Sequence, residues 1–369
     1  MSILYTFVQQ VNNAGVSGTI IDPGAFKAAS AGMGKDDVEV SWNEILTETY
    51  DLAEECPFLF CSDLIHQELL LLLLSWEHCK YAIVTGANKG VGFGVVKQLA
   101  SNGIMTVLTA RDEKRGLEAV EKLKECGLSD LVVFHQLDVT NPASIASLAD
   151  FVKTQFGKLD ILVNNAAVIG SILNPEAFRA VPSKKLEEVD WNEVSTPNYE
   201  LSEECLKTNY YGTKRVTQAL LPLLELSDSP RLVIVSSSIV KLLYFPDGWP
   251  KEVLSDAESL TEERIDVVLS QLLEDFKQGL VETKGCWPAS FLAYTVSKAA
   301  LNAYTRILAK KYPSFCINCV CPGYVKTDIN CNSGILTIEE GAESVVRLGL
   351  LPNGSPTGQF FIRKELTPF

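Results

Sequence analysis

Short apolar runs alternate with helical stretches from Tyr81 onward, and this alternation limits the possible fold more than any other feature. The runs have the length and β-branched content of buried strands. They cover Tyr81–Thr85, Thr106–Thr109, Leu131–Phe134, Leu159–Val163, Leu232–Val235 and Ile317–Val320. Strands that alternate with helices pair in parallel through right-handed crossovers. The sequence therefore predicts an α/β fold with a single Rossmann-type, doubly wound parallel sheet.

The first part of the chain contains a partial copy of a later segment. Val11–Val16 reads Val-Asn-Asn-Ala-Gly-Val and recurs at Val163–Val168 as Val-Asn-Asn-Ala-Ala-Val. A solenoid would need several successive units at a fixed period. We therefore interpret residues 1–80 as a partial repeat of residues 163–205 plus a leucine-rich joining segment, not as an independent domain. Our hypothesis is a remnant of a tandem gene or a mis-joined gene model in front of a domain spanning 81–369.

Charge and cysteine content exclude several classes of partner. A formal net charge of −14 without clustered basic residues argues against nucleic-acid binding. The apolar run Leu69–Leu74 is too short for a bilayer span, which needs about 20 residues, and Met1 is not followed by a secretory signal pattern. The ten cysteines lack framework spacing, which suits a reducing compartment. We expect a cytoplasmic protein with no nucleic-acid or membrane partner.

Two groups of cysteines raise the question of a metal site. Cys316 and Cys319 form a CxxC, but they lie in an alternating run that is typical of a strand. There Cys319 and Cys321 would share one face, as packed core thiols do. A second group lacks the paired short spacings of a structural zinc site; its members are Cys61, His66, His78 and Cys79. We expect no metal at either place.

A glycine-rich turn joins the first predicted strand to the helix after it. It reads Thr85-Gly-Ala-Asn-Lys-Gly-Val-Gly-Phe-Gly94, and its glycines would let backbone amides approach a pyrophosphate at the helix N-terminus. The second strand ends near Arg111. An acidic residue there would bind a ribose 2′-hydroxyl, whereas arginine accommodates a 2′-phosphate. Arg111, with Lys89 in the turn, therefore favours NADP(H) over NAD, although Asp112 carries the opposite signal.

Tyr294 and Lys298 stand four residues apart on a predicted helix that continues through Ala309. Residues at this spacing share a helix face, so the phenol and the ammonium project the same way. A free phenol titrates at about 10, and a neighbouring ammonium favours the phenolate. We expect Lys298 to lower the pKa of Tyr294 and so to support proton exchange near neutrality.

These motifs stand in the order found in short-chain dehydrogenases/reductases, and residues 81–369 resemble that family. The glycine turn is followed by Asn164-Asn-Ala166, Ser237, Tyr294-x-x-x-Lys298 and Pro322–Thr327. Within the family the chain is most similar to the plant salutaridine reductase and menthone/neomenthol reductase group, which is related to animal carbonyl reductases. The segments that carry this likeness are Thr85–Gly90, Leu206–Gly212, Leu260–Asp266 and Asn318–Gly323.

The segment from Val240 to Phe291 resembles an insertion that this plant group carries before the catalytic helix. The added helix, expected at Glu262–Leu280, covers in those relatives the face that other members use to oligomerise. The resemblance therefore implies a monomer. The same stretch also reads as an amphipathic surface helix, and the two interpretations are compatible.

The resemblance assigns a role to each motif residue. Tyr294 would be the general acid in reduction, Lys298 would hold the nicotinamide ribose and tune Tyr294, and Ser237 would bind the substrate carbonyl. Asn209 would complete a proton relay towards Lys298, although an asparagine at a helix bend is the plainer interpretation. Cofactor contacts are implied for Gly86, Asn88, Lys89, Gly90, Val91, Gly92, Arg111, Asp138, Val139, Asn165, Tyr294, Lys298, Pro322, Gly323, Val325 and Thr327.

Two departures from the family pattern affect these expectations. Ala167 stands where the family has glycine, which would strain the loop if a positive φ were needed there. Three successive serines, Ser236–Ser238, leave the register of the catalytic serine open, and the usual serine pair favours Ser237.

The resemblance predicts an NADP-dependent oxidoreductase that acts on CH–OH and C=O groups. Its substrate would be a small hydrophobic ketone or alcohol of terpenoid or alkaloid type, as in plant specialised metabolism. The alternative is a catalytically impaired nucleotide-binding protein that arose from a tandem-gene fusion. A redox or metal module built on the cysteines is disfavoured by their placement in a strand.

Overall fold

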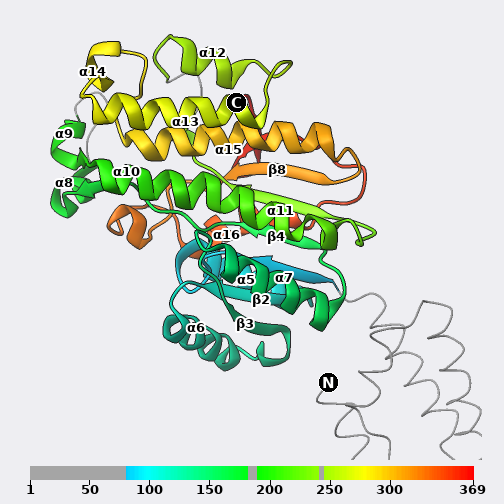
Figure 1. Ribbon diagram of the computed structural model, residues 1–369. Helices are drawn as coiled ribbons and strands as arrows, with labels where there is room; N and C mark the ends of the chain where they lie inside the picture. The colour runs from blue at the N-terminus through cyan, green and yellow to red at the C-terminus, as the bar shows by residue number, and fades with distance from the viewer. Residues whose placement is uncertain (1–79, 182–188, 241–244) are drawn as a thin grey trace, which may run out of the picture. The chain divides into compact units, whose positions relative to one another are not determined.

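Eight strands form the central sheet in the order β10-β9-β8-β7-β4-β1-β2-β3. The computed structural model describes residues 80–181, 189–240 and 245–369, and Figure 1 shows the sheet between its helices. The strands are β1 Tyr81–Val84, β2 Met105–Ala110, β3 Val132–Gln136, β4 Ile161–Asn164, β7 Arg231–Val235, β8 Cys316–Cys321, β9 Gln359–Ile362 and β10 Glu365–Thr367. The expected repeat, the leucine-rich segment and the group of Cys61, His66, His78 and Cys79 lie outside the described residues.

The pairing of these strands confirms the predicted parallel, Rossmann-type sheet. In the central sheet the seven strands β9-β8-β7-β4-β1-β2-β3 pair in parallel throughout, with Ile83 opposite Val107 on one side and Leu162 on the other. The last strand, β10, runs antiparallel to β9. These two strands were not among the predicted runs. The order reverses at β1 and β4, and open α/β sheets bind their ligands in the crevice at such a reversal.

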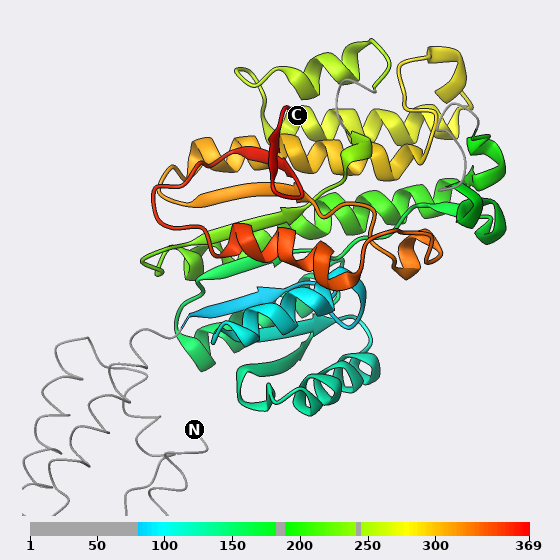
Figure 2. The same ribbon diagram turned by 180° about the vertical axis from the view of Figure 1, so that it is seen from behind.

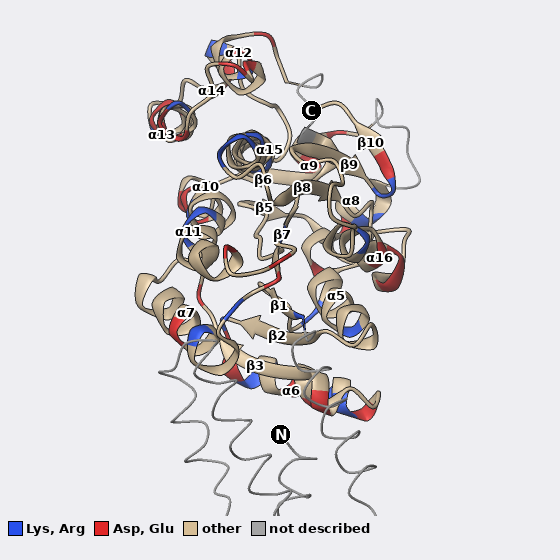
Figure 3. Ribbon diagram, turned by 90° about the vertical axis from the view of Figure 1, so that its right-hand side faces the viewer, with Lys and Arg blue, Asp and Glu red and all other residues tan. Residues whose placement is uncertain are grey.

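Helices cover both faces of the sheet, because successive strand residues point to opposite sides. In β1, Ile83 belongs to one buried cluster, whereas Ala82 and Val84 belong to the other. Figure 3 shows α7, α11 and α15 on one side and α5 and α16 on the other. The flanking helices are α5 Gly90–Ser101, α6 Glu113–Glu125, α7 Pro142–Phe156, α11 Thr213–Leu224, α15 Leu292–Lys311 and α16 Ile338–Gly349.

Two of these helices pack unusually closely. Figure 2 shows α5 (cyan) and α16 (red-orange) side by side on one face of the sheet. The contact passes through Gly94, where a Cβ would lie 2.7 Å from Cγ2 of Ile338. A larger residue at position 94 would separate the helices, and it would thereby disturb the helix that starts at the glycine turn.

The insertion before the catalytic helix forms a helical layer outside α15. It contains α12 Trp249–Ser255, α13 Glu262–Lys277 and α14 Val281–Lys284. One face of α13 is fully buried through Ile265, Val268, Leu269 and Leu272, and Figure 1 shows this helix running along α15. No helix in the described ranges has both the length and the apolar character that a membrane span needs.

Short elements cover the end of the sheet where the predicted site residues lie. Strands β5 Ser171–Leu173 and β6 Ser195–Pro197 form a two-stranded antiparallel sheet. The nearby helices are α8 Pro175–Ala180, α9 Trp191–Val194 and α10 Tyr199–Leu206, which continues into the π-helical turn η4 Lys207–Gly212. The described residues also contain three 3-10 turns, namely η1 Ser129–Leu131, η5 Ser238–Val240 and η7 Asp328–Asn330.

Candidate active site

The glycine turn between β1 and α5 packs directly against the chain that leaves β4. Gly86 has a φ of +62°, and a Cβ there would lie 2.9 Å from Cα of Ala166. At Gly92 a Cβ would lie 2.5 Å from Nδ2 of Asn165. Both positions require glycine, because a side chain would displace the loop after β4 and Gly86 also needs a left-handed backbone. The turn can therefore approach a bound group with bare backbone.

Asn165 holds this turn in shape. Its Nδ2 donates to the carbonyl oxygens of Thr85 at 2.9 Å and Gly86 at 3.0 Å, and its backbone N–H donates to Oγ1 of Thr85 at 2.9 Å. The neighbouring Ala167 does not have a positive φ; among described non-glycine residues that conformation occurs at Phe291, Cys331, Asn332 and Arg363. The strain that an alanine could have caused at position 167 is therefore not present.

Two cations lie at the edge of the crevice. Arg111 follows β2 with its side chain 70% exposed, and its closest carboxylate contact is Glu204 at 3.8 Å. Lys89 donates to Oδ2 of Asp328 at 2.7 Å. Asp112 is occupied elsewhere, because its Oδ1 accepts from the backbone N–H of Arg115 at 2.9 Å and so caps α6. The carboxylate beside Arg111 is thus used as a helix cap, whereas in the described part of the chain no such bond holds the exposed guanidinium of Arg111 to its own turn.

Asp138 and Val139 follow β3 next to the same crevice. Oδ1 of Asp138 accepts from the backbone N–H of Thr140 at 2.9 Å and from its hydroxyl at 2.7 Å. Val139 is buried against the π-helical turn, since a Cβ at Gly212 would lie 2.7 Å from Cγ2 of Val139. Asn88 in the glycine turn is half-buried. These contacts bring the ends of β1, β2 and β3 to one side of the sheet.

The π-helical turn η4 buries Asn209 completely. Oδ1 of Asn209 accepts from the backbone N–H of Val168 at 2.9 Å, while Nδ2 donates to the carbonyl of Val168 at 3.0 Å. Nδ2 also lies 3.0 Å from Oγ of Ser297 on α15. The side chain therefore fixes the loop after Asn165 and ties it to the catalytic helix. Nδ2 also donates to Sγ of Cys205 at 3.1 Å, and among the described residues no hydrogen bond joins Asn209 to Lys298.

Ser237, Tyr294 and Lys298 meet at the carboxyl end of β7. The hydroxyl groups of Ser237 and Tyr294 are hydrogen-bonded. Ser236 instead donates to Oδ1 of Asn302 at 2.6 Å inside the core, so Ser237 is the serine directed to the tyrosine. Nζ of Lys298 donates to the carbonyl of Val235 at 2.7 Å and lies 5.7 Å from the ring centroid of Tyr294.

Burial dominates the protonation of the tyrosine and the lysine. Burial raises the pKa of Tyr294 above its ordinary value, and the hydrogen bond with Ser237 offsets only part of this effect. The expected lowering of the pKa of Tyr294 by Lys298 is therefore wrong for this structure. The ammonium lies near the ring and bonds to Val235, and desolvation outweighs its attraction for a phenolate. Burial also lowers the pKa of Lys298 to about 8.

The segment Pro322–Thr327 after β8 lies across the crevice from the glycine turn. Gly323 has a φ of +92°, which turns the chain sharply, and Val325 is buried. A Cβ at Gly90 would lie 3.3 Å from Cγ2 of Thr327. Together with the Lys89–Asp328 pair, this contact places the loop after β8 and the glycine turn side by side. The two halves of the sheet therefore contribute to one site.

An apolar cluster lies against Tyr294, and we call its four largest rings the aromatic wall. These rings belong to Phe178, Trp191, Phe291 and Tyr324. Phe291 has its ring centroid 5.6 Å from that of Phe178 and 5.7 Å from that of Trp191. No residue of the aromatic wall was among the site residues expected from the sequence. The rings come from four distant segments, and no periodicity connects them.

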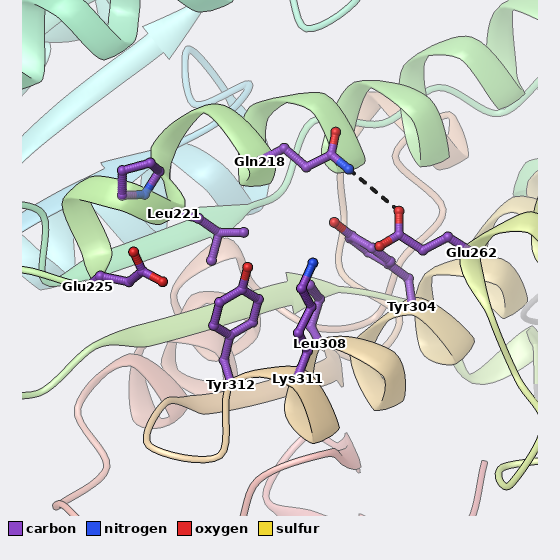
Figure 4. Close-up of a pocket in the computed structure, with 9 residues that line it drawn as sticks. Gln218, Leu221, Glu225, Glu262, Tyr304, Leu308, Lys311 and Tyr312 are labelled. Carbon is purple, nitrogen blue, oxygen red and sulfur yellow. Dashed lines mark hydrogen bonds between the residues drawn. The ribbon is translucent and has the colours of Figure 1, made fainter.

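A separate hollow of about 210 Å³ lies at the other end of α15. Figure 4 shows Tyr304, Lys311 and Tyr312 around it, with Gln218 bonded to Glu262 across its rim. Tyr304 follows Tyr294 by ten residues, which corresponds to about 15 Å along a helix. The hollow shares no residue with the predicted site, and it is therefore not the substrate cavity.

Comparison with known proteins agrees with this arrangement of residues. The profile of the family described as short chain dehydrogenase matches residues 80–245. A (+)-neomenthol dehydrogenase from Arabidopsis thaliana is 60% identical over 296 residues, which cover 79% of this chain and 99% of the relative. The solved structure of salutaridine reductase from Papaver somniferum superposes with a TM-score of 0.72 at 54% identity, over 77% of this chain and 99% of that one. Carbonyl reductase [NADPH] 1 from Rattus norvegicus is 38% identical over 78% of this chain and 98% of the relative.

Proposed function

Because the chain belongs to the short-chain dehydrogenase family, we propose that it is an NADPH-dependent carbonyl reductase that interconverts a hydrophobic terpenoid- or alkaloid-like ketone and its alcohol. Its relatives support the broader class of an oxidoreductase acting on alcohols and ketones. One observation carries the proposal: Ser237, Tyr294 and Lys298 meet beside an apolar, aromatic surface. A hydride acceptor with a polar carbonyl and an apolar body matches that combination.

The residues around the crevice fit a dinucleotide. Gly86 and Gly92 let the turn pack closely against Ala166 and Asn165, and this tight shape brings its backbone amides to the helix N-terminus where a pyrophosphate would bind. Lys298 is buried and uses one of its three ammonium donors on Val235, which leaves donors for ribose hydroxyl groups. The exposed guanidinium of Arg111 is available to bind a 2′-phosphate, which NADPH carries and NADH lacks. We propose further cofactor contacts for the residues of the glycine turn and of the chain segments that leave β3, β4 and β8 at the same edge of the sheet. These residues are Asn88, Lys89, Gly90, Val91, Asp138, Val139, Asn165, Pro322, Gly323, Val325 and Thr327.

Tyr294 and Ser237 would perform the proton chemistry. When bound, the nicotinamide supplies a hydride to the carbonyl carbon. The carbonyl oxygen then gains negative charge, and hydrogen bonds from Ser237 and Tyr294 stabilise it best in a dry, preorganised site. Tyr294 transfers its proton to that oxygen. The raised pKa of Tyr294 keeps the phenol protonated at neutral pH, so the residue is in the correct form for reduction.

Asn209 and Lys298 would act on the geometry and the charge of this centre. Asn209 fixes Val168 and Ser297, so it positions the loop and the helix that frame the substrate. Lys298 would hold the nicotinamide ribose and contribute a positive charge next to Tyr294. All four groups are needed together, because a displaced ketone would meet neither the hydride nor the proton.

Turnover of a ketone panel tests this proposal directly. NADPH consumption should be measured with substituted cyclic ketones for the wild type and for Tyr294→Phe. The variant should lose about 10³-fold in kcat, because it lacks the general acid, while its Kd for NADPH stays unchanged. Tight NADPH binding without turnover of any ketone by the wild type would instead favour a nucleotide-binding protein.

We also infer a cytoplasmic monomer. The apolar face of α13 covers α15, and Lys214 on α11 pairs with Glu262 at 3.0 Å and Asp266 at 3.2 Å. These contacts occupy part of the outer surface of the two helices. Every described cysteine is a free thiol, which suits a reducing compartment. Light scattering at micromolar protein concentration measures the mass and would reveal a dimer.

A further inference from the structure

Phe291 occupies an unusual position at the start of the catalytic helix. It is 6% exposed and precedes Leu292, the first residue of α15, with a left-handed backbone at φ 46° and ψ 46°. Bulky residues rarely adopt this conformation unless the surrounding structure imposes it. The conformation directs the ring into the aromatic wall, where it contacts Phe178 and Trp191. Tyr294 packs against the same cluster.

A buried carboxylate anchors the chain four residues before Phe291. Asp275 on α13 is fully buried, and its Oδ2 accepts from Nε1 of Trp287 at 2.9 Å. Its Oδ1 accepts from Lys284 and from Gln271, each at 2.6 Å. Every bond to this carboxylate comes from the insertion or from the loop that follows it.

Trp287 is also fixed on its other side. Its ring is 4% exposed and lies edge-on to Trp249, the first residue of α12, with the centroids 5.9 Å apart. Pro288 follows directly and restricts the backbone. The segment between Trp287 and Phe291 is therefore short and held at its first residue, and Thr295 closes it by donating its hydroxyl to the carbonyl of Ser290 at 3.1 Å.

We propose that Phe291 is a specificity-determining residue that selects ketones with a bulky alicyclic body, and that Asp275 is the positioning residue that holds it through Trp287. The proposal rests on the proposed function and deepens it. The ring of Phe291 is itself buried and packs against Phe178 and Trp191, so it supports the apolar surface beside the carbonyl site. The Asp275–Trp287 bond sets where that support lies. The insertion thereby takes part in substrate choice although its helices lie outside the sheet.

Two ketones that share a ring test the role of Phe291. Menthone carries alkyl groups on a cyclohexanone ring, and unsubstituted cyclohexanone does not. Phe291→Ala should lower kcat/KM for menthone by about tenfold, mainly through KM, since the apolar surface that would contact the alkyl groups loses its support. The value for cyclohexanone should change little. Phe291→Gly, which accepts a positive φ without strain, should show the same selectivity; unchanged selectivity in both variants overturns the proposal.

Breaking the anchor should shift selectivity in the same direction. Trp287→Phe removes the indole donor of this hydrogen bond, and Asp275→Leu removes its acceptor. Each should lower the menthone-to-cyclohexanone ratio of kcat/KM by about fivefold because the ring is displaced. The double variant should shift the ratio no further than Asp275→Leu alone, because that variant has already lost the bond to Trp287. Asp266→Leu is the matched control, since Asp266 lies on α13 but pairs with Lys214. Equal ratios in Asp275→Leu and Asp266→Leu would contradict a positioning role.

Binding separates a failure of this proposal from a failure of the proposed function. If the wild type reduces no ketone, the reductase proposal fails. Calorimetry then measures the Kd of menthone for the protein with NADPH bound, and this Kd tests the role of the aromatic wall separately. Weaker binding of menthone to Phe291→Ala than to the wild type supports the proposed role of Phe291 even when no turnover occurs. Equal affinity, or no binding of menthone to the wild type, overturns it. An affinity for NADPH equal to that of the wild type shows that the fold of each variant is intact.

Discussion

The ammonium of Lys298 donates to the backbone carbonyl of Val235 at 2.7 Å, so the catalytic helix is attached to the end of the strand that leads to Ser237. The lysine is only 2% exposed, and no carboxylate of the described residues forms an ion pair with it. A charge held in this way is costly for folding and useful for chemistry. Two predictions follow from this contact.

The rate of reduction should fall as the pH rises through about 8, the value to which burial lowers the pKa of Lys298. Below that pH the lysine is an ammonium, and above it the charge beside Tyr294 is lost. The pKa of Tyr294 is raised, so the phenol stays protonated over the same interval and does not cause the fall. The measurement is kcat/KM for a ketone from pH 6 to pH 10, and a flat profile would contradict the assignment.

Lys298→Met should inactivate the protein and yet stabilise it at pH 7. The wild type must keep a charge in a desolvated site, whereas the variant has no charge there. The variant also loses the hydrogen bond to Val235, so we expect its free energy of unfolding to exceed that of the wild type by about 2 kcal/mol. Between the folded pKa of about 8 and the ordinary lysine pKa of 10.5, the unfolded wild type binds more protons than the folded one. Wild-type stability therefore rises relative to the variant in this window. Urea unfolding at pH 7 and pH 10 should show the difference shrinking, whereas an equal or less stable variant at pH 7 would refute the argument.

Gly92→Ala should weaken NADPH binding by at least about tenfold, because the new methyl group displaces the amide that holds Thr85 and Gly86. Gly349→Ala serves as the control. It adds the same methyl group at the end of α16, at an ordinary 3.4 Å from Ile161. Fluorescence titration with NADPH measures both variants. Matching affinities would mean that the turn does not hold the pyrophosphate.

Arg111→Ala should raise the KM for NADPH by about tenfold and leave the KM for NADH nearly unchanged, because only NADPH has the 2′-phosphate that the guanidinium would bind. Arg115→Ala is the matched control, since Arg115 is also exposed and lies 3.8 Å from the capping Asp112. An equal loss with both cofactors would show that Arg111 does not read the 2′-phosphate.

A variant that begins at Lys80 should keep its activity and its affinity for NADPH. Every residue assigned to the site lies after that point, and residues 79–369 form one compact unit. Steady-state kinetics of the shortened and full-length proteins provide the test. A folded but inactive product would mean that the first part of the chain takes part in function.

Sequence periodicity was sufficient for six of the eight strands of the central sheet, because strands buried on both faces are continuous apolar runs. The predicted run Ile317–Val320 lies within β8, and Cys319 and Cys321 share one buried cluster as the alternation indicated. Strands β9 and β10 were missed. Both strands are short; β10 is at the edge of the sheet and β9 lies next to it. Such strands owe their pairing to the neighbouring strand more than to their own pattern.

Spacing along the chain identified which polar residues meet, but not their protonation. Tyr294 and Lys298 share a helix face, as expected from four-residue spacing. The direction of the tyrosine's pKa depends on how completely the surrounding elements exclude water, and that information is spread over the whole fold. The aromatic wall was missed for a similar reason, since Phe178, Trp191 and Phe291 come together only through tertiary packing.

The π-helical turn at Lys207–Gly212 shifts the phase between the helical segments on either side of it. A wider turn takes in one extra residue, and one residue corresponds to a rotation of about 100° around a helix. Asn209 can thus reach Val168 while Val216 and Leu220, further along, remain in the core. A deletion of a single residue within this turn would rotate every later side chain of α11 away from its present neighbours. The segment should therefore tolerate exchanges of residue type far better than any change of length.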